Sequence, residues 1–257
     1  IKMVDIAKLA KTVDDAAHKA RSIPQLSEKT KYSLDDAYAI QSASIQRRLD
    51  RGEKRNGMKM GFTSRAKMIQ MGLNDMIWGR LTDQMMVEDG DTISLKNYVH
   101  PRVEPEIAFL LKRPLGYPCT AAEALSAVDG VAPAMEIIDS RYRNFKFSLE
   151  DVVADNASSS SFVVGPWHRP DTDLENLGMI MEFNGRPVQI GSSAAILGQP
   201  VRSLVSAARL TAEAGEGLQA GWIVMAGGAT AAEALRPGVH VRNSVQGLGS
   251  VAFSVTE

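Results

Sequence analysis

Three glutamates in two short segments have the residue type and spacing of a metal-binding cluster. Glu104 and Glu106 alternate within VEPEIAFLLK (103–112), which has the composition of a β-strand, so both side chains should share one face with their Cα atoms ~6.5–7 Å apart. Glu136 lies in the apolar run AMEIID, where an isolated carboxylate is unfavourable to bury. Oxygen ligands without a Cys or a His pair favour Mg²⁺ or Mn²⁺ over zinc. Because Glu-x-Glu is a common pattern, a solvent-facing strand edge paired with neighbouring arginines is the alternative.

Pro105, between the first two glutamates, should interrupt regular strand pairing. It has no backbone N–H to donate to a neighbouring strand. Proline is therefore largely confined to edge strands, bulges and strand starts. Functional sites are often built at such irregular places. We expect one of these irregularities within 103–112.

Lys59 is a second candidate for chemistry, because it lies between two methionines in the apolar segment GMKMGF (57–62). A buried lysine can take part in proton transfer or provide a fixed positive charge. Lysines also commonly pack the aliphatic stem and extend the amine into water. The segment alone leaves both interpretations open.

Two further segments have residues that could face a substrate. Asp155 and Asn156 precede Ala-Ser-Ser-Ser-Ser and indicate either a loop or a substrate-facing wall. Gly227 and Gly228 follow the strand-like WIVMA, where backbone N–H groups could bind a carboxylate, although a tight turn is an equally good interpretation. The G-x-G-x-x-G spacing of dinucleotide-binding proteins is absent from the sequence.

The pattern along the chain predicts an α+β fold, with a helical N-terminal part (1–75) and one continuous β-rich body (76–257). Ser33 and the pair Thr120 and Glu123 should cap helices, and Asn184-Gly185 should form a hairpin turn. Helices are expected over 3–21, 34–50, 121–128 and 201–214, with a short one from Ser64 to Gly72. Strands are expected over 57–62, 103–112, 131–139, 161–165, 178–184, 222–228, 239–243 and 250–255.

Composition and charge narrow the class of protein. The chain of 257 residues is 44% hydrophobic and 23% charged, and its formal net charge of -1 favours neither nucleic acid nor an anionic membrane. No apolar run reaches the ~20 residues that cross a bilayer, and the first residues lack the apolar core of a signal peptide. The single cysteine, Cys119, excludes an internal disulfide and fits a reducing compartment. We expect a cytoplasmic protein with no nucleic-acid or membrane partner.

Taken together, these segments resemble the fumarylacetoacetate hydrolase superfamily, in the branch that contains the hydratases and decarboxylases of aromatic meta-cleavage pathways. The resemblance extends from DDAYAIQ (35–41) to GLGSVAFSV (247–255). Its most specific segments are GMKMGFTSRAKMIQMG (57–72), HPRVEPEIAF (100–109), PAMEIIDSRYRNFKF (133–147) and VVADNASS (152–159). It implies a β-rich mixed-sheet roll, similar to the fumarylacetoacetase C-terminal domain, with a helical N-terminal part.

The resemblance also implies which residues form the site. Glu104, Glu106 and Glu136 match the metal-binding carboxylates of the family, for Mg²⁺ (or Mn²⁺), and Lys59 and Asp155 match its catalytic positions. The expected substrate-binding residues are Ser158, Gly228, Thr230, Arg141 and Asp83. Among these, the arginine could bind the second carboxylate of a diacid or could equally be a surface charge.

The activity implied by the resemblance is metal-dependent decarboxylation of 2-oxo-3-hexenedioate, because the segments KMGFTSRAKMIQMG, IDSRYRNFKF and GGATAA resemble the decarboxylases more than the hydratases. Hydration of 2-hydroxypenta-2,4-dienoate and a catalytically silent oxo-acid-binding protein are the alternatives. The hydrolase branch is disfavoured, because its water-activating His/Glu pair lies on an N-terminal element and no histidine occurs between His18 and His100. The expected partners are a small 2-oxo diacid, further copies of the chain in a homo-oligomer, and a hydratase that receives an unstable dienol product.

Overall fold

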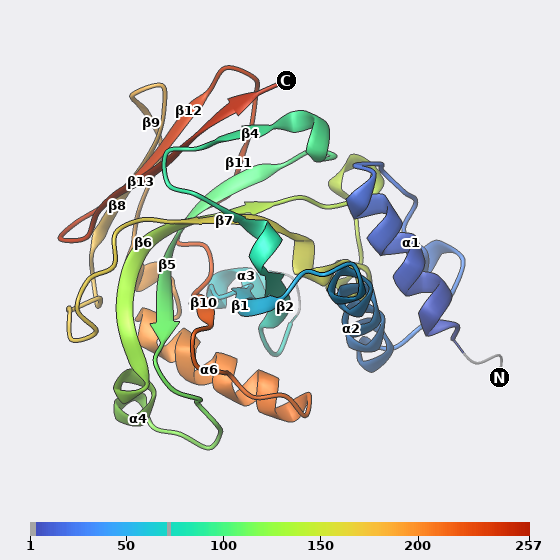
Figure 1. Cartoon of the computed structure of the whole chain (residues 1–257), viewed down its shortest axis with the longest axis horizontal. Coiled ribbons are helices and arrows are strands. Elements are labelled where there is room, and N and C mark those ends of the chain that lie inside the picture. Colours follow the sequence, from blue (N-terminus) through green and yellow to red (C-terminus); the bar gives the residue numbers. More distant parts are fainter. Residues whose placement is uncertain (1–3, 71–72) are drawn as a thin grey trace.

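A large β-sheet forms the centre of the molecule (Figure 1). In the computed structural model, which describes residues 4–70 and 73–257, its strand order is β2-β1-β10-β5-β6-β7-β3, and β11 pairs with β5 outside that path. The long strands β5 and β6 run antiparallel through its middle. The strands are β1 (Arg55–Gly61), β2 (Ile77–Thr82), β3 (Met86–Val87), β5 (Arg102–Leu111), β6 (Val128–Ile138), β7 (Ser159–Val164), β10 (Ile223–Met225) and β11 (Glu233–Ala234).

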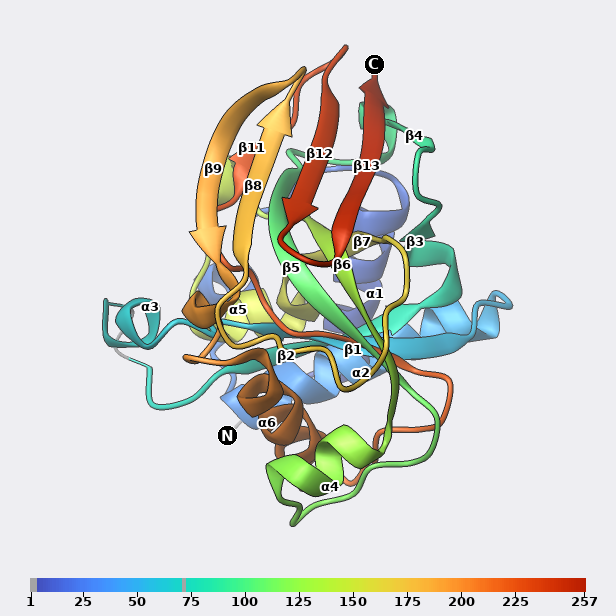
Figure 2. The ribbon, with the colours of Figure 1, turned by 90° about the vertical axis from the view of Figure 1, so that its left-hand side faces the viewer.

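A smaller sheet packs against the β5, β6 and β7 part of the large sheet (Figure 2). Its order is β4-β13-β12-β8-β9. Met181 and Phe253 of the small sheet share a hydrophobic core with Val103 and Met135 of the large one, so every second residue of these strands is buried between two sheets. The expected α+β fold with mixed sheets is confirmed. The strands of the small sheet are β4 (Thr92–Ser94), β8 (Gly178–Phe183), β9 (Arg186–Ser192), β12 (His240–Val245) and β13 (Gly249–Thr256).

The hairpin between β8 and β9 turns at Asn184 and Gly185, as expected from the sequence. Their φ angles are 51° and 76°. Both residues thus have the positive φ that a type I′ turn requires, which Asn and Gly tolerate best.

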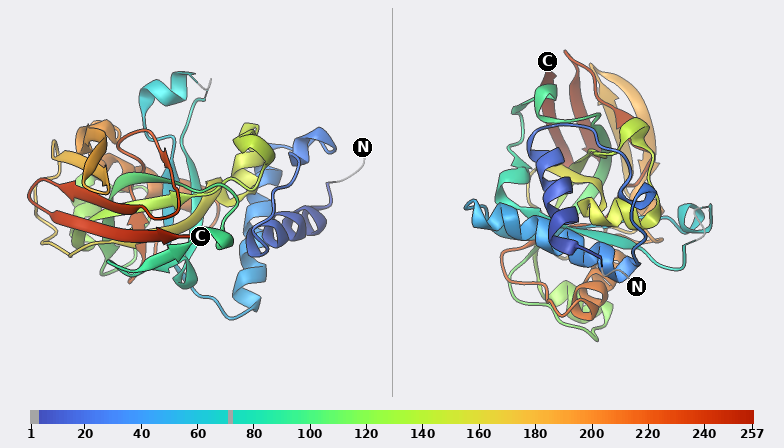
Figure 3. Two further views of the ribbon diagram at one scale, coloured as in Figure 1. Left: turned by 90° about the horizontal axis from the view of Figure 1, so that it is seen from above. Right: turned by 90° about the vertical axis from the view of Figure 1, so that its right-hand side faces the viewer.

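Two N-terminal helices, α1 (Ile6–His18) and α2 (Leu34–Asp50), lie at one end of the molecule, and strands β8 and β9 lie toward the other (Figures 1 and 3). Ser33 accepts a hydrogen bond from the Asp36 N–H and so caps α2, as predicted. Asp14 of α1 is 1% exposed and accepts hydrogen bonds from Arg47 and Arg51 of α2. These ion pairs fasten the two helices to each other.

The remaining helices lie around the large sheet. Thr120 and Glu123 form the predicted capping box of α4, and α6 begins with Pro200 in its first turn. Leu204 and Ala208 of α6 belong to the same core as Phe109 of β5. The short helix α3 projects from the body (Figure 2). The bounds are α3 (Arg65–Gln70), α4 (Ala121–Ser126), α5 (Leu149–Ala154) and α6 (Pro200–Glu213). No helix among the described residues is long and apolar enough to cross a membrane.

Some predictions differ from the structure. Strand β1 pairs with both β10 and β2, so the large sheet extends across the division expected at residue 75. The strand expected over 222–228 is limited to β10, because the chain leaves the sheet as a loop at Ala226. Strand β2 and helix α5 had no counterpart among the expected elements. The helix start expected at residue 3 and the helix end expected at Gly72 lie outside the described residues.

Candidate active site

The pairing of β5 with β6 brings three carboxylates together. Glu104 lies directly opposite Glu136, and Glu106 lies two residues along on the same face of β5. One carboxylate oxygen from each glutamate lies within 4.8 Å of the other two. Glu106 and Glu136 are fully buried, whereas Glu104 is half-buried and lines a cleft. The structure thus brings the three glutamates together at one place.

Burial and mutual repulsion make this cluster unfavourable for protein groups alone. Burial, together with repulsion from Glu136 and Glu104, raises the pKa of Glu106 well above its ordinary value. Burial raises the pKa of Glu136 to about 7, although Lys59 opposes this shift. Oε1 of Glu106 and Oε2 of Glu136 are buried and have no hydrogen-bond partner among the described residues. Buried acceptors without a partner are rare. A divalent cation that prefers oxygen ligands would give both of these carboxylate oxygens a partner. The three residues therefore fit Mg²⁺ or Mn²⁺.

An interruption in the pairing of β5 makes room for the loop that follows β10. Strand β5 pairs with β10 over residues 108–110 and with β11 over 102–103, and Pro105 lies between these two stretches. The Pro105 carbonyl accepts a hydrogen bond of 2.9 Å from the Ala229 N–H of this loop. Pro105 is therefore not at the sheet edge, bulge or strand start expected from the sequence, but inside a central strand that stays paired with β6 and lacks strand pairing only on its other side.

Two glycines let this loop pass close to the carboxylates. Gly227 has φ 108°, and its N–H donates to Oε2 of Glu106 at 2.9 Å. A Cβ at Gly228 would lie 2.5 Å from Oε2 of Glu104, so any larger residue would displace that carboxylate. The Gly227 N–H thus binds a carboxylate of the cluster, and Gly228 lines the cleft.

Lys59 extends from β1 to the same cluster. Its Nζ lies 3.0 Å from Oε1 of Glu136 and donates to the Ala157 carbonyl at 2.9 Å. The residue is 3% exposed, so the amine does not extend into bulk water. An ammonium group has three donors. One of them donates to Ala157 and the ion pair with Glu136 fixes the amine on another side, so a donor remains available to the cleft that Lys59 lines.

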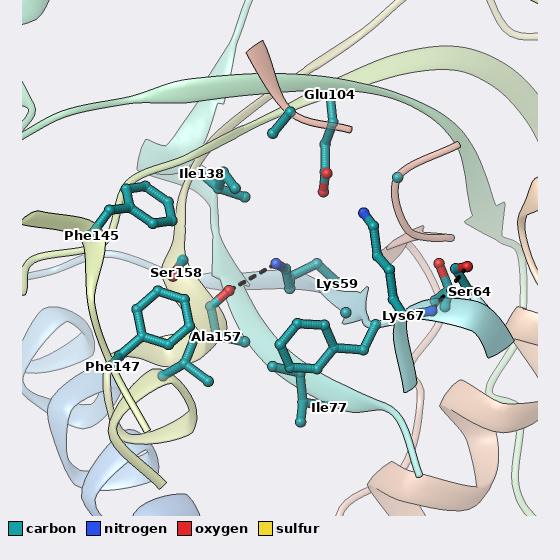
Figure 4. A pocket seen from close by; sticks show the side chains of 16 residues that line it. Lys59, Ser64, Lys67, Ile77, Glu104, Ile138, Phe145, Phe147, Ala157 and Ser158 are labelled. Atoms are coloured by element: carbon teal, nitrogen blue, oxygen red, sulfur yellow. Dashed lines mark hydrogen bonds between the residues drawn. The ribbon is translucent and has the colours of Figure 1, made fainter. Parts of the chain in front are cut away.

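A cleft of about 180 Å³ opens in front of Lys59 and Glu104 (Figure 4). Its walls are mainly apolar, and their larger side chains are Phe62, Ile77, Ile138, Phe145, Phe147 and Val152. Lys67 of α3 extends its amine toward Glu104 (Figure 4). The cleft thus has one carboxylate, Glu104, and two lysine amines, Lys59 and Lys67, beside a mainly apolar wall.

The expected substrate-binding residues have different surroundings. Ser158 and Gly228 line the cleft. Thr230 donates its hydroxyl to the Ala231 carbonyl at 2.8 Å and is not among the lining residues. Asp83 follows β2, where its Oδ1 accepts the N–H groups of Lys54 at 2.8 Å and Gln84 at 3.0 Å. This position in a turn does not support a substrate contact for Asp83.

Arg141 and Asp155 form a buried ion pair outside the cleft lining. Nε of Arg141 lies 2.7 Å from Oδ1 of Asp155, and the Arg141 backbone N–H donates to Oδ2 at 2.9 Å. Burial raises the pKa of Asp155 to about 6, although Arg141 opposes this shift. Arg141 is 2% exposed, and each of its three guanidinium nitrogens donates to Asp155 or to the Ser159 carbonyl, so its position does not support binding of a substrate carboxylate.

Asp155→Ala is expected to lower the free energy of unfolding by about 3–5 kcal/mol, because it leaves the Arg141 charge buried without its partner. Urea unfolding followed by circular dichroism measures this change. Asp171→Ala is the control, since Asp171 pairs with Arg169 on the surface and its removal should change little. Equal losses in the two variants would contradict a structural role for the buried pair.

The family model of the fumarylacetoacetate (FAA) hydrolase C-terminal region matches residues 63–256. The chain belongs to this family. Within the family, it is 59% identical over 251 residues to a 4-oxalocrotonate decarboxylase of Pseudomonas sp, covering 98% of each chain. It is 40% identical over 222 residues to a 2-keto-4-pentenoate hydratase of Paraburkholderia xenovorans (strain LB400), covering 85% of this chain and 82% of the hydratase.

A solved family member has nearly the same fold. The 4-oxalocrotonate decarboxylase from Pseudomonas putida G7, complexed with magnesium and adipate, superposes with a TM-score of 0.95 at 40% identity and covers 99% of both chains. The match of the family model begins at residue 63, after β1, so Lys59 lies just outside it. The longer alignments to the relatives include nearly the whole chain.

Several residues that line the cleft of this chain had no assigned role in the sequence interpretation. Lys67, Phe145 and Phe147 fall within segments that carry the family resemblance, which was the available signal. Ala157 also falls within such a segment, but the orientation of its carbonyl depends on backbone angles that a side chain does not reveal.

Proposed function

We propose that this chain is a divalent-metal-dependent decarboxylase of 2-oxo-3-hexenedioate (4-oxalocrotonate), giving 2-hydroxypenta-2,4-dienoate and CO₂. The observation that carries the proposal is the buried cluster of three carboxylates beside Lys59, at the edge of a mainly apolar cleft. The relatives named as decarboxylases support it, and the 59% identical one covers 98% of the chain.

Glu104, Glu106 and Glu136 would hold the metal, with Mg²⁺ favoured by the oxygen ligands and by the magnesium complex of the similar P. putida enzyme. When bound, the metal supplies Lewis-acid stabilisation of the negative charge that develops on the 2-oxo oxygen. The buried oxygens of Glu106 and Glu136 that have no hydrogen-bond partner are available as ligands for the metal.

Lys59 would stabilise the same oxygen from the protein side. In the reaction, the C5–C6 bond breaks, CO₂ leaves, and the electron pair moves through the C3–C4 double bond onto the 2-oxo oxygen. The resulting dienolate takes up one proton on that oxygen to give 2-hydroxypenta-2,4-dienoate. Lys59 lines the cleft, and a donor of its ammonium that Ala157 does not use can donate to this oxygen as its charge grows. Glu136 and Ala157 hold the amine in place for this purpose.

The apolar wall favours loss of CO₂ over addition of water. A leaving carboxylate beside Phe145, Phe147 and Val152 exchanges hydration for apolar contact, while the neutral CO₂ has little need of hydration. A hydratase must instead bind and orient a water molecule. Lys67, which extends toward Glu104, can attract the C1 carboxylate of the diacid.

Mass spectrometry of 2-oxo-3-hexenedioate incubated with the protein tests the proposal, with Mg²⁺ in one sample and excess chelator in the other. We expect loss of one CO₂ only in the sample with Mg²⁺. An unchanged diacid, together with addition of water to 2-hydroxypenta-2,4-dienoate, would support the hydratase alternative. Tight binding of the diacid without turnover would indicate an oxo-acid-binding protein.

We further propose that the protein forms a homo-oligomer and associates with a hydratase, because the dienol product is unstable and benefits from direct transfer. The hydratases among the relatives support the existence of such an enzyme class. Light scattering of the protein alone, and of a mixture with a purified hydratase, measures both associations. A monomer that does not bind the hydratase would contradict this part of the proposal.

A further inference from the structure

The wall of the cleft beside Lys59 contains a run of left-handed residues. Asn156, Ala157 and Ser158 have φ angles of 53°, 52° and 60°. None of them is glycine, and this conformation is unfavourable for residues that carry a Cβ. A run of three such residues persists only where its surroundings hold it, and such backbone is concentrated at functional sites.

The Asn156 side chain fastens this turn to β2. Its Oδ1 accepts the Arg80 N–H at 2.7 Å, and its Nδ2 donates to the Arg80 carbonyl at 2.8 Å, as a neighbouring strand would. Gly79 allows the close approach, because a Cβ there would lie 2.5 Å from the Asn156 carbonyl oxygen and 2.6 Å from Oγ of Ser159. Asn156 is 5% exposed, so water does not compete for these bonds.

The conformation of this turn determines the direction of the Ala157 carbonyl. That carbonyl accepts the hydrogen bond from Nζ of Lys59. Lys59 pairs with Gly79 across β1 and β2, so the lysine and the turn are positioned by adjacent strands. Lys59 is therefore linked to the turn in two ways. Its strand pairs with β2, to which Asn156 is bonded, and its amine donates to the Ala157 carbonyl.

We propose that Asn156 is a positioning residue for Lys59. By holding the left-handed turn against β2, it directs the Ala157 carbonyl at the lysine amine and keeps that amine beside Glu136 at the edge of the cleft. This role rests on the catalytic use of Lys59 in the proposed function. Asn156 is not among the residues that line the cleft. Its expected effect on turnover therefore acts through Lys59 and not through contact with the substrate.

Asn156→Ala tests the role by steady-state kinetics with Mg²⁺ and 2-oxo-3-hexenedioate. We expect kcat to fall about 10- to 100-fold, because a small displacement of a catalytic group is sufficient for such a loss. KM and the Kd for Mg²⁺ from calorimetry should stay unchanged. In the Lys59→Met background, Asn156→Ala should cause no further loss, since both changes remove the same function. Losses that multiply fully would overturn the proposal.

A second measurement is independent of turnover. Acetic anhydride labelling of the metal-free protein, followed by mass spectrometry of the peptide that contains Lys59, reports how firmly its amine is held. We expect labelling of Lys59 to accelerate about 5-fold or more in Asn156→Ala, because the amine is released from Ala157. If the wild type does not turn over the diacid, the proposed function fails, and these labelling rates still decide the positioning role.

Ser193→Ala is the matched control. Ser193 is fully buried and also ties two segments together, since its Oγ donates to the Leu174 carbonyl at 2.6 Å and accepts the Leu177 N–H at 2.7 Å. Its removal should leave kcat and the labelling of Lys59 unchanged. Should Asn156→Ala not fold, Asn156→Gly removes the same bonds without backbone strain. Normal kcat together with wild-type labelling in the folded variant would overturn the proposal.

Discussion

Glu106→Gln is expected to reduce metal-dependent turnover by at least about 10³-fold, because a neutral amide replaces a charged ligand and several kcal/mol of charge stabilisation are lost with the metal. Glu106 is fully buried between two other carboxylates. Burial and repulsion disfavour its ionised form, so removal of this charge should not lower the free energy of unfolding of the metal-free protein. The variant should therefore be folded and inactive.

Thermal unfolding with and without Mg²⁺ separates these two effects. Mg²⁺ should raise the Tm of the wild type, because a ligand that binds the folded state stabilises it, and it should not raise the Tm of Glu106→Gln. Glu182→Gln is the control, since Glu182 pairs with Arg242 in the small sheet, away from the cluster. A fully active Glu106→Gln enzyme would exclude Glu106 as a ligand.

The elements that carry the glutamates could be predicted from the sequence because their signals are local. Alternation along β5 places Glu104 and Glu106 on one face whatever the rest of the chain does. The apolar neighbours of Glu136 indicate that it is buried. Pro105 marks the interruption in pairing, because a missing N–H has the same consequence in any fold. From these signals alone a solvent-facing strand edge remained the alternative, and the resemblance to the family decided in favour of the metal cluster.

The partners of Lys59 and Arg141 could not be predicted in this way. Lys59 meets Glu136 and Ala157 only because β1 joins the large sheet beside β10, and the spacing between these residues along the chain contains no information on that pairing. Arg141 binds Asp155 because α5 returns the chain to the end of β6. An arginine in a polar segment has the same local pattern whether it binds a substrate or a buried aspartate.

The sequence is also silent about backbone conformation that no glycine marks. Gly227 and Gly228 indicated either a carboxylate-binding loop or a tight turn, and the structure places both against the carboxylates. The left-handed turn that includes Ala157 contains no glycine, and the side chain of its first residue, Asn156, holds it by hydrogen bonds to the backbone of Arg80. Long-range hydrogen bonds of this kind are tertiary information, and they decide which carbonyl faces the lysine.

Lys59→Met is expected to lower kcat by about 10²- to 10⁴-fold, the range typical of a group that donates charge or a proton in the transition state. Methionine keeps the length of the side chain and its packing in β1 but has no donor for the 2-oxo oxygen. The positive charge beside Glu136 disappears as well, so Mg²⁺ should bind as tightly as in the wild type or more tightly. Loss of turnover with retained metal binding is the combination that identifies a catalytic role.

Calorimetry with Mg²⁺ and steady-state kinetics measure the two effects, with Lys96→Met as an exposed control. Lys59→Arg distinguishes charge from position, because the planar guanidinium keeps the charge but cannot reproduce the geometry of an ammonium group between Glu136 and the Ala157 carbonyl. If charge alone matters, Lys59→Arg should recover most of the activity. If the donor must be positioned, as the two contacts indicate, Lys59→Arg should be nearly as inactive as Lys59→Met. Unimpaired turnover of Lys59→Met would contradict both and would leave the metal site as the sole source of catalysis.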